Sequence, residues 1–144
     1  MSTASYQPSL SSLNLDPADT NTHPALANEL TELLTTLSVP VSGQRAPFSE
    51  VLSLIQRYYR HQPTAFDNGN QHNSAEQNQG SCKVLAFAAL HGLTADKTLS
   101  LFAEHYQSVL ETPQGTDHAN IRQFIAQGWA GVRFAASPLK PLSE

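Results

Sequence analysis

The chain has a single cysteine, only eight lysine and arginine residues, and no apolar run near the roughly 20 residues that span a membrane. One cysteine excludes an intrachain disulfide, so the fold holds without a covalent crosslink. The formal net charge of -4 leaves no concentrated basic surface of the kind that binds nucleic acids or anionic membranes. The N-terminus also lacks the basic and apolar regions of a secretory signal peptide. These absences predict no nucleic-acid partner and no membrane partner, which leaves a protein or a small molecule as the expected ligand.

The length of 144 residues and the hydrophobic content of 40% predict one compact domain with a single core. Residues 1–22 are rich in serine, threonine and asparagine without periodicity, which is typical of a disordered leader. Residues 23–46 are expected to form a peripheral helix followed by a linker that contains a proline and a glycine. The main helical domain is predicted over residues 47–136, and residues 137–144 are expected to form a loose tail.

Apolar residues at helical spacing predict the first three helices. Leucines three and four residues apart indicate a helix over residues 24–37, and Pro24 suits its first turn. A broad apolar face indicates a second helix over residues 47–60. Ser81 is expected to cap a third helix that is apolar nearly all round and ends at His91-Gly92. This third helix should lie buried at the centre of the domain.

Two further helices follow. Thr94 is expected to cap a fourth helix that continues to Pro113. Thr116 or Asp117 is expected to cap a fifth helix, which Gly128 closes.

The segment over residues 67–80 is almost wholly polar and is predicted to be a long loop, in which Asn68-Gly69 favours a tight turn. Residues 64–66 are expected to form a very short strand, and residues 129–134 a short extended or turn segment. No alternating pattern is long enough to indicate a sheet. The predicted fold is therefore all-α, a single bundle-like helical domain with a long polar loop and a very short β segment.

Cys82 is the first candidate for chemistry. In the first turn of the third helix, free backbone N–H groups and the charge of Lys83 would lower the pKa of its thiol. His118 as a base, oriented by Asp117 or Asn120, would complete a Cys–His–Asn arrangement similar to that of papain-like thiol hydrolases. The competing interpretation is a small buried cysteine in a helical core.

Asp117, His118 and Asn120 form the second candidate, because the turn after Gly115 places them at a helix N-terminus. The backbone donors of such an end can bind a small anion. The simpler interpretation is that Asp117 caps the helix, Asn120 takes the capping-box position and His118 points outward. The sequence leaves both interpretations open.

The histidines do not form a metal-binding motif. His91, His105 and His118 could meet with Glu104 or Asp117, but the chain has no His-x-x-x-His, no cysteine pair and no His-Glu-x-x-His. His91 precedes a closing glycine, where an imidazole interacts favourably with a helix C-terminus. We therefore predict no metal and no cofactor.

Trp129 stands between small residues, so a ligand could approach its flat indole closely, although packing in the core is an equally simple role. Arg122 and Arg133 lie near small-residue turns and could bind a carboxylate or a phosphate, or remain solvated at the surface.

Five ordered motifs carry a family resemblance. They are Pro63-Thr64-Ala65-Phe66-Asp67-Asn68-Gly69, Gly80-Ser81-Cys82-Lys83, His91-Gly92, Thr116-Asp117-His118-Ala119-Asn120-Ile121-Arg122 and Gly128-Trp129-Ala130-Gly131. Together they resemble the HopJ family, named for type III effectors of plant-associated bacteria, over about residues 48–134. The resemblance implies a bacterial protein that acts in the cytoplasm or passes into a host cell through a type III system. It implies no particular reaction.

The expected function is a small binding or interaction module for an unknown protein or small-molecule ligand. The alternative is a thiol-dependent hydrolase or transferase that uses Cys82 and His118, with Asp117 or Asn120 as the orienting group. The motifs predict a ligand-binding surface at turns and helix ends. Its predicted residues are Asn68, Gly69, Gly80, Ser81, His91, Thr116, Arg122 and Trp129.

Overall fold

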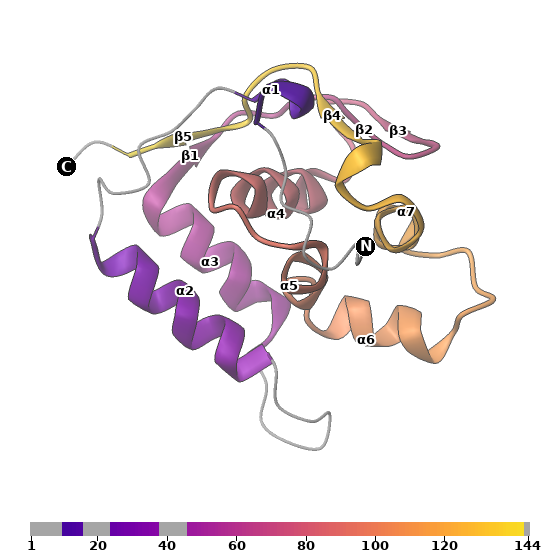
Figure 1. The fold of residues 1–144 in the computed structure, drawn as a ribbon, viewed down its shortest axis with the longest axis horizontal. Helices are drawn as coiled ribbons and strands as arrows, with labels where there is room; N and C mark the ends of the chain where they lie inside the picture. Colours follow the sequence, from indigo (N-terminus) through magenta and orange to yellow (C-terminus); the bar gives the residue numbers. More distant parts are fainter. Residues whose placement is uncertain (1–9, 16–23, 38–45, 143–144) are drawn as a thin grey trace.

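The computed structural model describes residues 10–15, 24–37 and 46–142. Its helices and strands are, in chain order, α1 (Leu10–Leu13), α2 (Pro24–Leu37), α3 (Phe48–Tyr58), β1 (Tyr59–His61), β2 (Phe66–Asn68), β3 (Gln71–Asn73), α4 (Gln79–Leu90), α5 (Ala95–Ser100), α6 (Glu104–Glu111), α7 (Ala119–Gln127), the 3-10 helix η2 (Gly128–Gly131), β4 (Val132–Phe134) and β5 (Leu139–Pro141). Figure 1 shows α4 at the centre, with α2 and α3 on one side, α5, α6 and α7 on the other, and the strands and α1 across the top.

Helix α4 is the core of the molecule, as its continuous apolar sequence predicted. Seven of its residues, from Cys82 to Ala89 apart from Lys83, are buried. Because no face of α4 is polar, the helix is stable only when other elements cover it on all sides. The strands lie above α4 and α3 packs against it, whereas the first residues of α4, Gln79 to Ser81, are only partly buried.

The prediction of an all-α fold was wrong, because the described residues form two small antiparallel sheets. β1 pairs with β5, and the second sheet has the strand order β3-β2-β4. Each strand has three residues, so the alternation in β2 and β4 is too short to stand out from a helical pattern. What stabilises the second sheet is a distant pairing, in which Phe66 lies opposite Phe134 with the ring centroids 5.8 Å apart.

The polar segment predicted as a long loop is largely a β-hairpin. The strands β2 and β3 are joined by a two-residue turn at Gly69 and Asn70, so the tight turn expected here is present. Gly69 has a φ of +59°, and its N–H donates to the carbonyl of Gly131 at 2.8 Å. The close approach of Gly131 leaves no room for a side chain, since a Cβ there would lie 2.9 Å from the nitrogen of Gly69. The hairpin is thereby fixed to η2.

The helix predictions hold for α2, whose bounds match the expected residues 24–37, and closely for α3. The single helix expected between Thr94 and Pro113 is instead two helices, α5 and α6. The chain breaks at Ala103, which has φ 54° and ψ -124°, a conformation that side chains rarely adopt. No glycine or proline marks this break, so nothing in the local sequence indicates it.

The peripheral segments contribute to the core more than expected. Within the expected leader, residues 10–15 contain α1 and bury Leu13, and the leucine face of α2 is buried against the domain. Residues 139–141, in the expected loose tail, pair with β1 as β5. Residues 1–9 and 16–22 of the leader, 38–45 of the linker and 143–144 of the tail lie outside the described residues. Within the described part, no helix has the length and hydropathy needed to cross a membrane.

Candidate functional site

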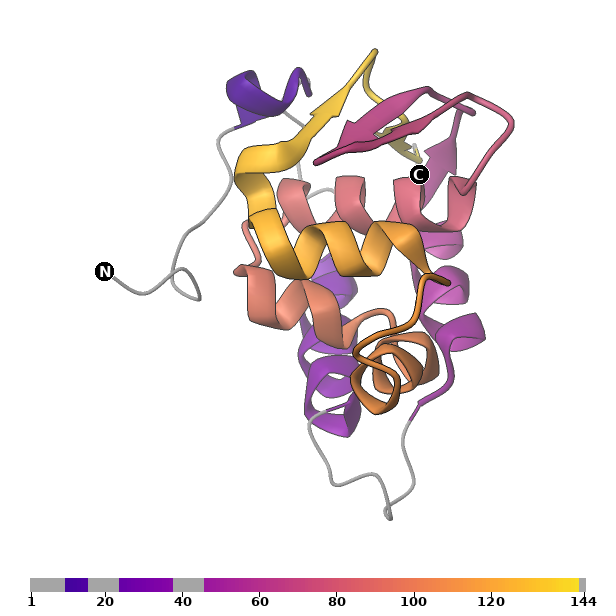
Figure 2. The same ribbon diagram turned by 90° about the vertical axis from the view of Figure 1, so that its right-hand side faces the viewer.

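A pocket of about 330 Å³ lies where the N-terminal ends of α4 and α7 meet the junction between α5 and α6. Figure 2 shows these two helix ends on the same side of the molecule. We call this cavity the two-histidine pocket. Its lining residues are Phe48, Asn78, Gly80, Ser81, Phe102, His105, His118, Ala119, Asn120 and Ile121. It therefore joins four of the predicted site residues, Gly80, Ser81, His118 and Asn120.

Helix α4 enters the pocket with an uncapped end. The helix begins at Gln79, so Asn78 and not Ser81 is the N-cap residue. Asn78 has a left-handed φ of 53°, and its side chain donates to the Oδ1 of Asn73 at 2.7 Å instead of capping α4. In the described part of the chain, the backbone N–H groups of Gly80 and Ser81 have no hydrogen-bond acceptor. These donors remain available to the pocket.

Helix α7 repeats the same arrangement. Its N-cap is His118, with a left-handed φ of 51° and no side-chain capping bond, so the predicted capping by Thr116 or Asp117 does not occur. The first intrahelical bond runs from the N–H of Arg122 to the carbonyl of His118. Among the described residues, the N–H groups of Ala119, Asn120 and Ile121 have no acceptor. Two helix ends thus direct free donors and positive partial charge at one pocket.

Arg122, a predicted ligand-binding residue, braces the loop before α7 instead. Its guanidinium and Nε donate to the carbonyl and side-chain oxygens of Thr112 and of Asp117, at distances from 2.6 to 3.1 Å. The hydrogen bond from Arg122 lowers the pKa of the Asp117 carboxyl. A Cβ at Gly115 would lie 2.7 Å from the guanidinium, so glycine leaves room for this contact. Thr116 is exposed on the same loop, which positions His118.

Two imidazoles face each other at the pocket. The ring centroids of His105 and His118 are 5.1 Å apart with a 40° angle between the planes. Phe48 and His105 meet in an edge-to-face arrangement with their ring centroids 4.9 Å apart. Phe48 is also nearly parallel to Phe102, with the centroids 6.1 Å apart. The strained backbone at Ala103 places Phe102 and His105 on the same pocket wall. Such strain costs about 1–3 kcal/mol and tends to persist at functional sites.

Four asparagines hold the pocket's two helix ends against the β-hairpin. We call Asn68, Asn73, Asn78 and Asn120 the asparagine cluster. Asn73 accepts from Asn78 and Asn120 through Oδ1 and donates to the Oδ1 of Asn120 at 3.1 Å. Asn68 donates to the carbonyl of Asn120 at 2.8 Å and to its Oδ1 at 3.1 Å. Sequence reasoning singled out Asn68 and Asn120 but missed Asn73 and Asn78, which appeared to be ordinary loop residues.

Cys82 directly follows the pocket residues Gly80 and Ser81 in sequence, but it does not line the pocket. Its side chain is fully buried, and its sulfur lies 3.7 Å from the carbonyl oxygen of Thr64. Burial raises the pKa of the Cys82 thiol to about 12, although the charge of Lys83 acts in the opposite direction. A thiol held neutral inside the core is a poor nucleophile. The geometry therefore favours the core interpretation over the thiol-dependent enzyme.

We expect Cys82 to resist alkylation in the native protein. At pH 7.5, iodoacetamide should label Cys82 at least 100-fold more slowly than free cysteine, because the thiolate is scarce and the sulfur is covered. Addition of a denaturing concentration of urea should bring the labelling rate to that of a model peptide. Mass spectrometry measures the labelled fraction over time. Labelling of the native protein as fast as that of free cysteine would contradict this assignment.

His91 is also remote from the pocket. Its Nε2 lies 2.9 Å from the hydroxyl of Tyr59, and its ring contacts Phe87 with the centroids 4.5 Å apart. Burial lowers the pKa of His91 to about 4 and raises that of Tyr59 to about 12. With both groups neutral, the phenol and the imidazole share one hydrogen bond, and the pair supports the end of α4. A ligand-binding role for His91 therefore has no support in the geometry.

Acid should destabilise the protein through His91. In the unfolded chain this histidine takes up a proton near pH 6.5, whereas in the folded protein it does so only near pH 4. The contribution of neutral His91 to the free energy of unfolding is therefore complete above pH 6.5 and is lost as the pH falls towards 4. Between pH 7.5 and 4.5 this loss amounts to about 2 kcal/mol. Urea unfolding at a series of pH values measures the free energy of unfolding. It should depend less on pH in His91→Gln than in wild type, whereas the control His72→Gln, which changes an exposed histidine, should behave as wild type. Equal slopes in all three proteins would contradict the assignment.

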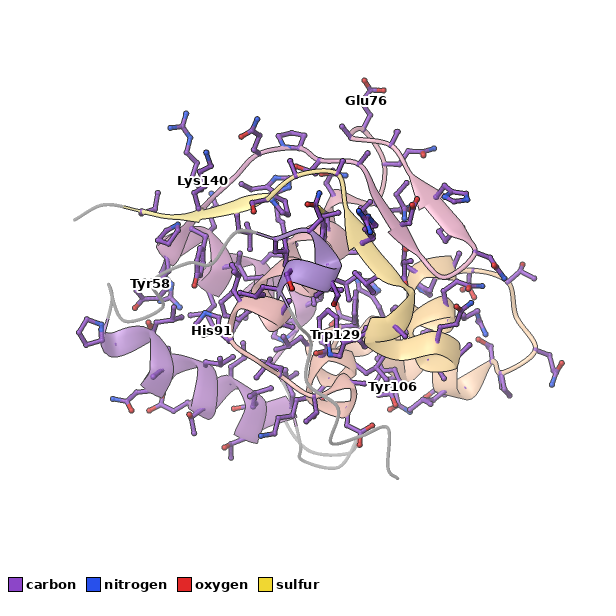
Figure 3. The ribbon with its side chains drawn as sticks, turned by 45° about the horizontal axis from the view of Figure 1, so that its top comes forward. Tyr58, Glu76, His91, Tyr106, Trp129 and Lys140 are labelled. Carbon is purple, nitrogen blue, oxygen red and sulfur yellow. The ribbon has the colours of Figure 1, made fainter. Side chains whose placement is uncertain are left out.

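Trp129 is a core residue. It is 2% exposed, its Nε1 donates to the carbonyl of Leu93 at 3.1 Å, and its ring meets Phe124 edge-on. Figure 3 shows Trp129 and His91 within the body of the molecule, whereas Glu76 projects from it. In the described segments, no group of three histidine, cysteine, aspartate or glutamate side chains is placed to hold a metal ion.

A larger pocket, of about 400 Å³, lies between α2 and α3. It gathers Glu29, Glu32 and Glu50, and its one arginine, Arg57, is 3.0 Å from Glu29. None of the residues predicted from the sequence lines it. We therefore take the two-histidine pocket as the candidate site.

Comparison with known proteins gives two similarities. Residues 30–139 match the model of the family described as HopJ type III effector protein. The crystal structure of VPA0580, a protein of unknown function, is 32% identical with a TM-score of 0.67, and the alignment covers 88% of this chain and 97% of that one. No curated protein matches the chain. The similarities support the fold and the family resemblance found from the motifs.

Proposed function

Because the chain belongs to the HopJ type III effector family, we propose that it is a small binding module whose two-histidine pocket binds the anionic group of a ligand. The family name implies delivery through a type III system, and we extend that route to this chain. The observation that carries the binding proposal is the convergence of two uncapped helix N-termini and two imidazoles on one pocket.

The free donors of the pocket match a negatively charged group. Gly80 and Ser81 present N–H groups from α4, while Ala119 and Asn120 present them from α7. Each helix end carries roughly half a positive charge, which favours a carboxylate or a phosphate at this position. At most helix ends a side-chain cap would accept from these N–H groups, but neither helix has one. The side chain of Asn78 instead bonds Asn73 within the asparagine cluster, and the side chain of His118 makes no capping bond.

The remaining walls suit a small organic ligand. Phe48 and Phe102 form a parallel aromatic pair, and Ile121 adds an aliphatic surface. A volume of about 330 Å³ lies within the range of pockets that hold small molecules. Because the formal net charge is -4, the protein as a whole repels anions. Only a local source of positive potential, such as the two helix ends at this pocket, favours their binding. A small metabolite or a short acidic peptide end therefore fits better than an extended polyanion.

Titration with inorganic phosphate tests this proposal. In ¹⁵N-resolved NMR spectra at constant ionic strength, the amides of Gly80, Ser81 and Ala119 should shift together along one saturable curve. His118→Gln should weaken phosphate about tenfold, because a hydrogen bond to a charged group contributes on the order of 1.4 kcal/mol. Exposed His72→Gln serves as the matched control and should leave the affinity unchanged. Shifts that are scattered over the surface, or equal affinities in both variants, would contradict the proposal.

A further inference from the structure

We propose that the two-histidine pocket hydrolyses a small phosphodiester, with His105 as general base and His118 as general acid. The inference rests on the proposed function, since the anionic group held in the pocket is here the reacting phosphate. It goes further, because it assigns proton transfer to the two imidazoles.

Neither imidazole of the pocket is held by a side-chain hydrogen bond within the part of the chain that the structure describes. Among the described residues, His105 makes ring contacts with Phe48 and His118 but no side-chain hydrogen bond. The nearest ionic partner of His118 is Asp117, with the Nε2 to Oδ2 distance at 3.9 Å, longer than a hydrogen bond. A buried structural histidine is normally held by a partner, as His91 is by Tyr59. The pair in the pocket lacks such partners among the described residues, so its ring nitrogens remain available to a bound substrate.

The environments of the two rings differ, and the difference assigns their roles. Asp117 lies beside His118, and its carboxylate attracts the protonated imidazolium. His105 is flanked by the aromatic ring of Phe48 and has no carboxylate within 4.0 Å in the described part of the chain. His118 therefore donates the proton and His105 accepts one.

The reaction balances with water as the nucleophile. His105 takes a proton from a water molecule while the water oxygen forms a bond to phosphorus. The bond from phosphorus to the leaving oxygen breaks, and His118 gives its proton to that oxygen. The products are a phosphate monoester and an alcohol, and exchange with solvent returns the proton from His105 to His118. No oxidant, reductant or metal takes part in this step.

The rest of the pocket supports this substrate class. Gly80, Ser81 and Ala119 line the pocket, and their N–H groups have no acceptor among the described residues, so they are available to stabilise charge that develops on phosphate oxygens. The parallel rings of Phe48 and Phe102 offer a flat wall to an organic substituent. Cys82 offers no competing thiolate, because its sulfur is buried against Thr64.

Hydrolysis of diphenyl phosphate by the full chain, followed between pH 5 and 8 as phenol release by liquid chromatography, tests the proposal, because phenol leaves slowly unless its oxygen is protonated. We expect a bell-shaped pH profile and a loss of at least 100-fold in His105→Gln and in His118→Gln, in line with the usual contribution of general acid–base groups. His72→Gln, which alters an exposed histidine outside the pocket, should keep the wild-type rate. Urea unfolding of each variant shows whether it is folded under the assay conditions, so that hydrolysis rates are compared only between folded proteins.

Three outcomes overturn the inference. They are turnover no faster than the buffer blank, turnover that survives both pocket substitutions, and a pH profile with a single limb. If phosphate shifts the amides of Gly80 and Ala119 while no diester is hydrolysed, the pocket binds anions without catalysis, and only the proposed function stands. If phosphate also leaves these amides unmoved, both proposals fail together.

Discussion

Replacing Asn73 with alanine is expected to destabilise the protein by about 3 kcal/mol, because the change leaves several buried groups without partners. The Asn73 side chain is 4% exposed and connects the hairpin to both helix ends through Asn78 and Asn120. Without it, the Nδ2 of Asn120 loses its acceptor in a buried position. Urea unfolding monitored by circular dichroism measures the change in the free energy of unfolding.

The neighbouring turn residue provides the control. Asn70 is exposed, and in the described structure only its backbone N–H is hydrogen-bonded, to Gln123. Asn70→Ala should therefore change the free energy of unfolding by less than about 0.5 kcal/mol. A double-mutant cycle between Asn73→Ala and Asn120→Ala should be strongly non-additive, since both residues belong to one network. Equal effects of Asn73→Ala and Asn70→Ala would show that the asparagine cluster contributes nothing.

The same substitution bears on the pocket. Asn73 holds the side chain of Asn78 away from the first turn of α4. Once released, Asn78 can turn back and accept from the N–H groups of its own helix, which is the preferred role of asparagine at an N-cap. Those groups are the donors that Gly80 and Ser81 offer to a ligand. In folded Asn73→Ala, phosphate should therefore bind more weakly than in Asn70→Ala.

Features that depend on local periodicity could be predicted from the sequence. The leucine spacing of α2 and the apolar length of α4 depend only on neighbours along the chain, and both predictions are confirmed. The sheets could not be predicted in this way, because β2 is completed by β4, more than 60 residues later in the sequence. Three-residue strands carry too few residues to show a period, and their pairing is decided by the core.

The candidate site was found in part, and the missing part has a backbone origin. Ser81 and Asp117 were expected to cap helices because their side chains suit that role, but left-handed residues at Asn78 and His118 start the helices elsewhere. Left-handed asparagine and histidine are uncommon and carry no sequence signature of their own. The wall formed by Phe102 and His105 depends on the turn at Ala103, which the helical pattern did not indicate.

Trp129→Ala should be the most destabilising single change considered, at about 4 kcal/mol, because it opens a cavity in the core. It also removes the donor to the carbonyl of Leu93 and the edge-on contact with Phe124. Trp129→Phe restores much of the volume but not the donor, so we expect a smaller loss of about 2 kcal/mol. Thermal and urea unfolding of the three proteins measure this order.

The ligand readout separates a core tryptophan from a ligand-facing one. Trp129 does not line the two-histidine pocket, so folded Trp129→Phe should bind phosphate with wild-type affinity even though its stability is lower. His118→Gln should show the opposite pattern, with weaker binding and little change in unfolding, since its side chain is 31% exposed and makes no short hydrogen bond. The two variants thus divide the motifs shared with the family into those that hold the fold and those that face the pocket. Weakened phosphate binding in Trp129→Phe at unchanged stability would place the indole at the ligand and contradict the division.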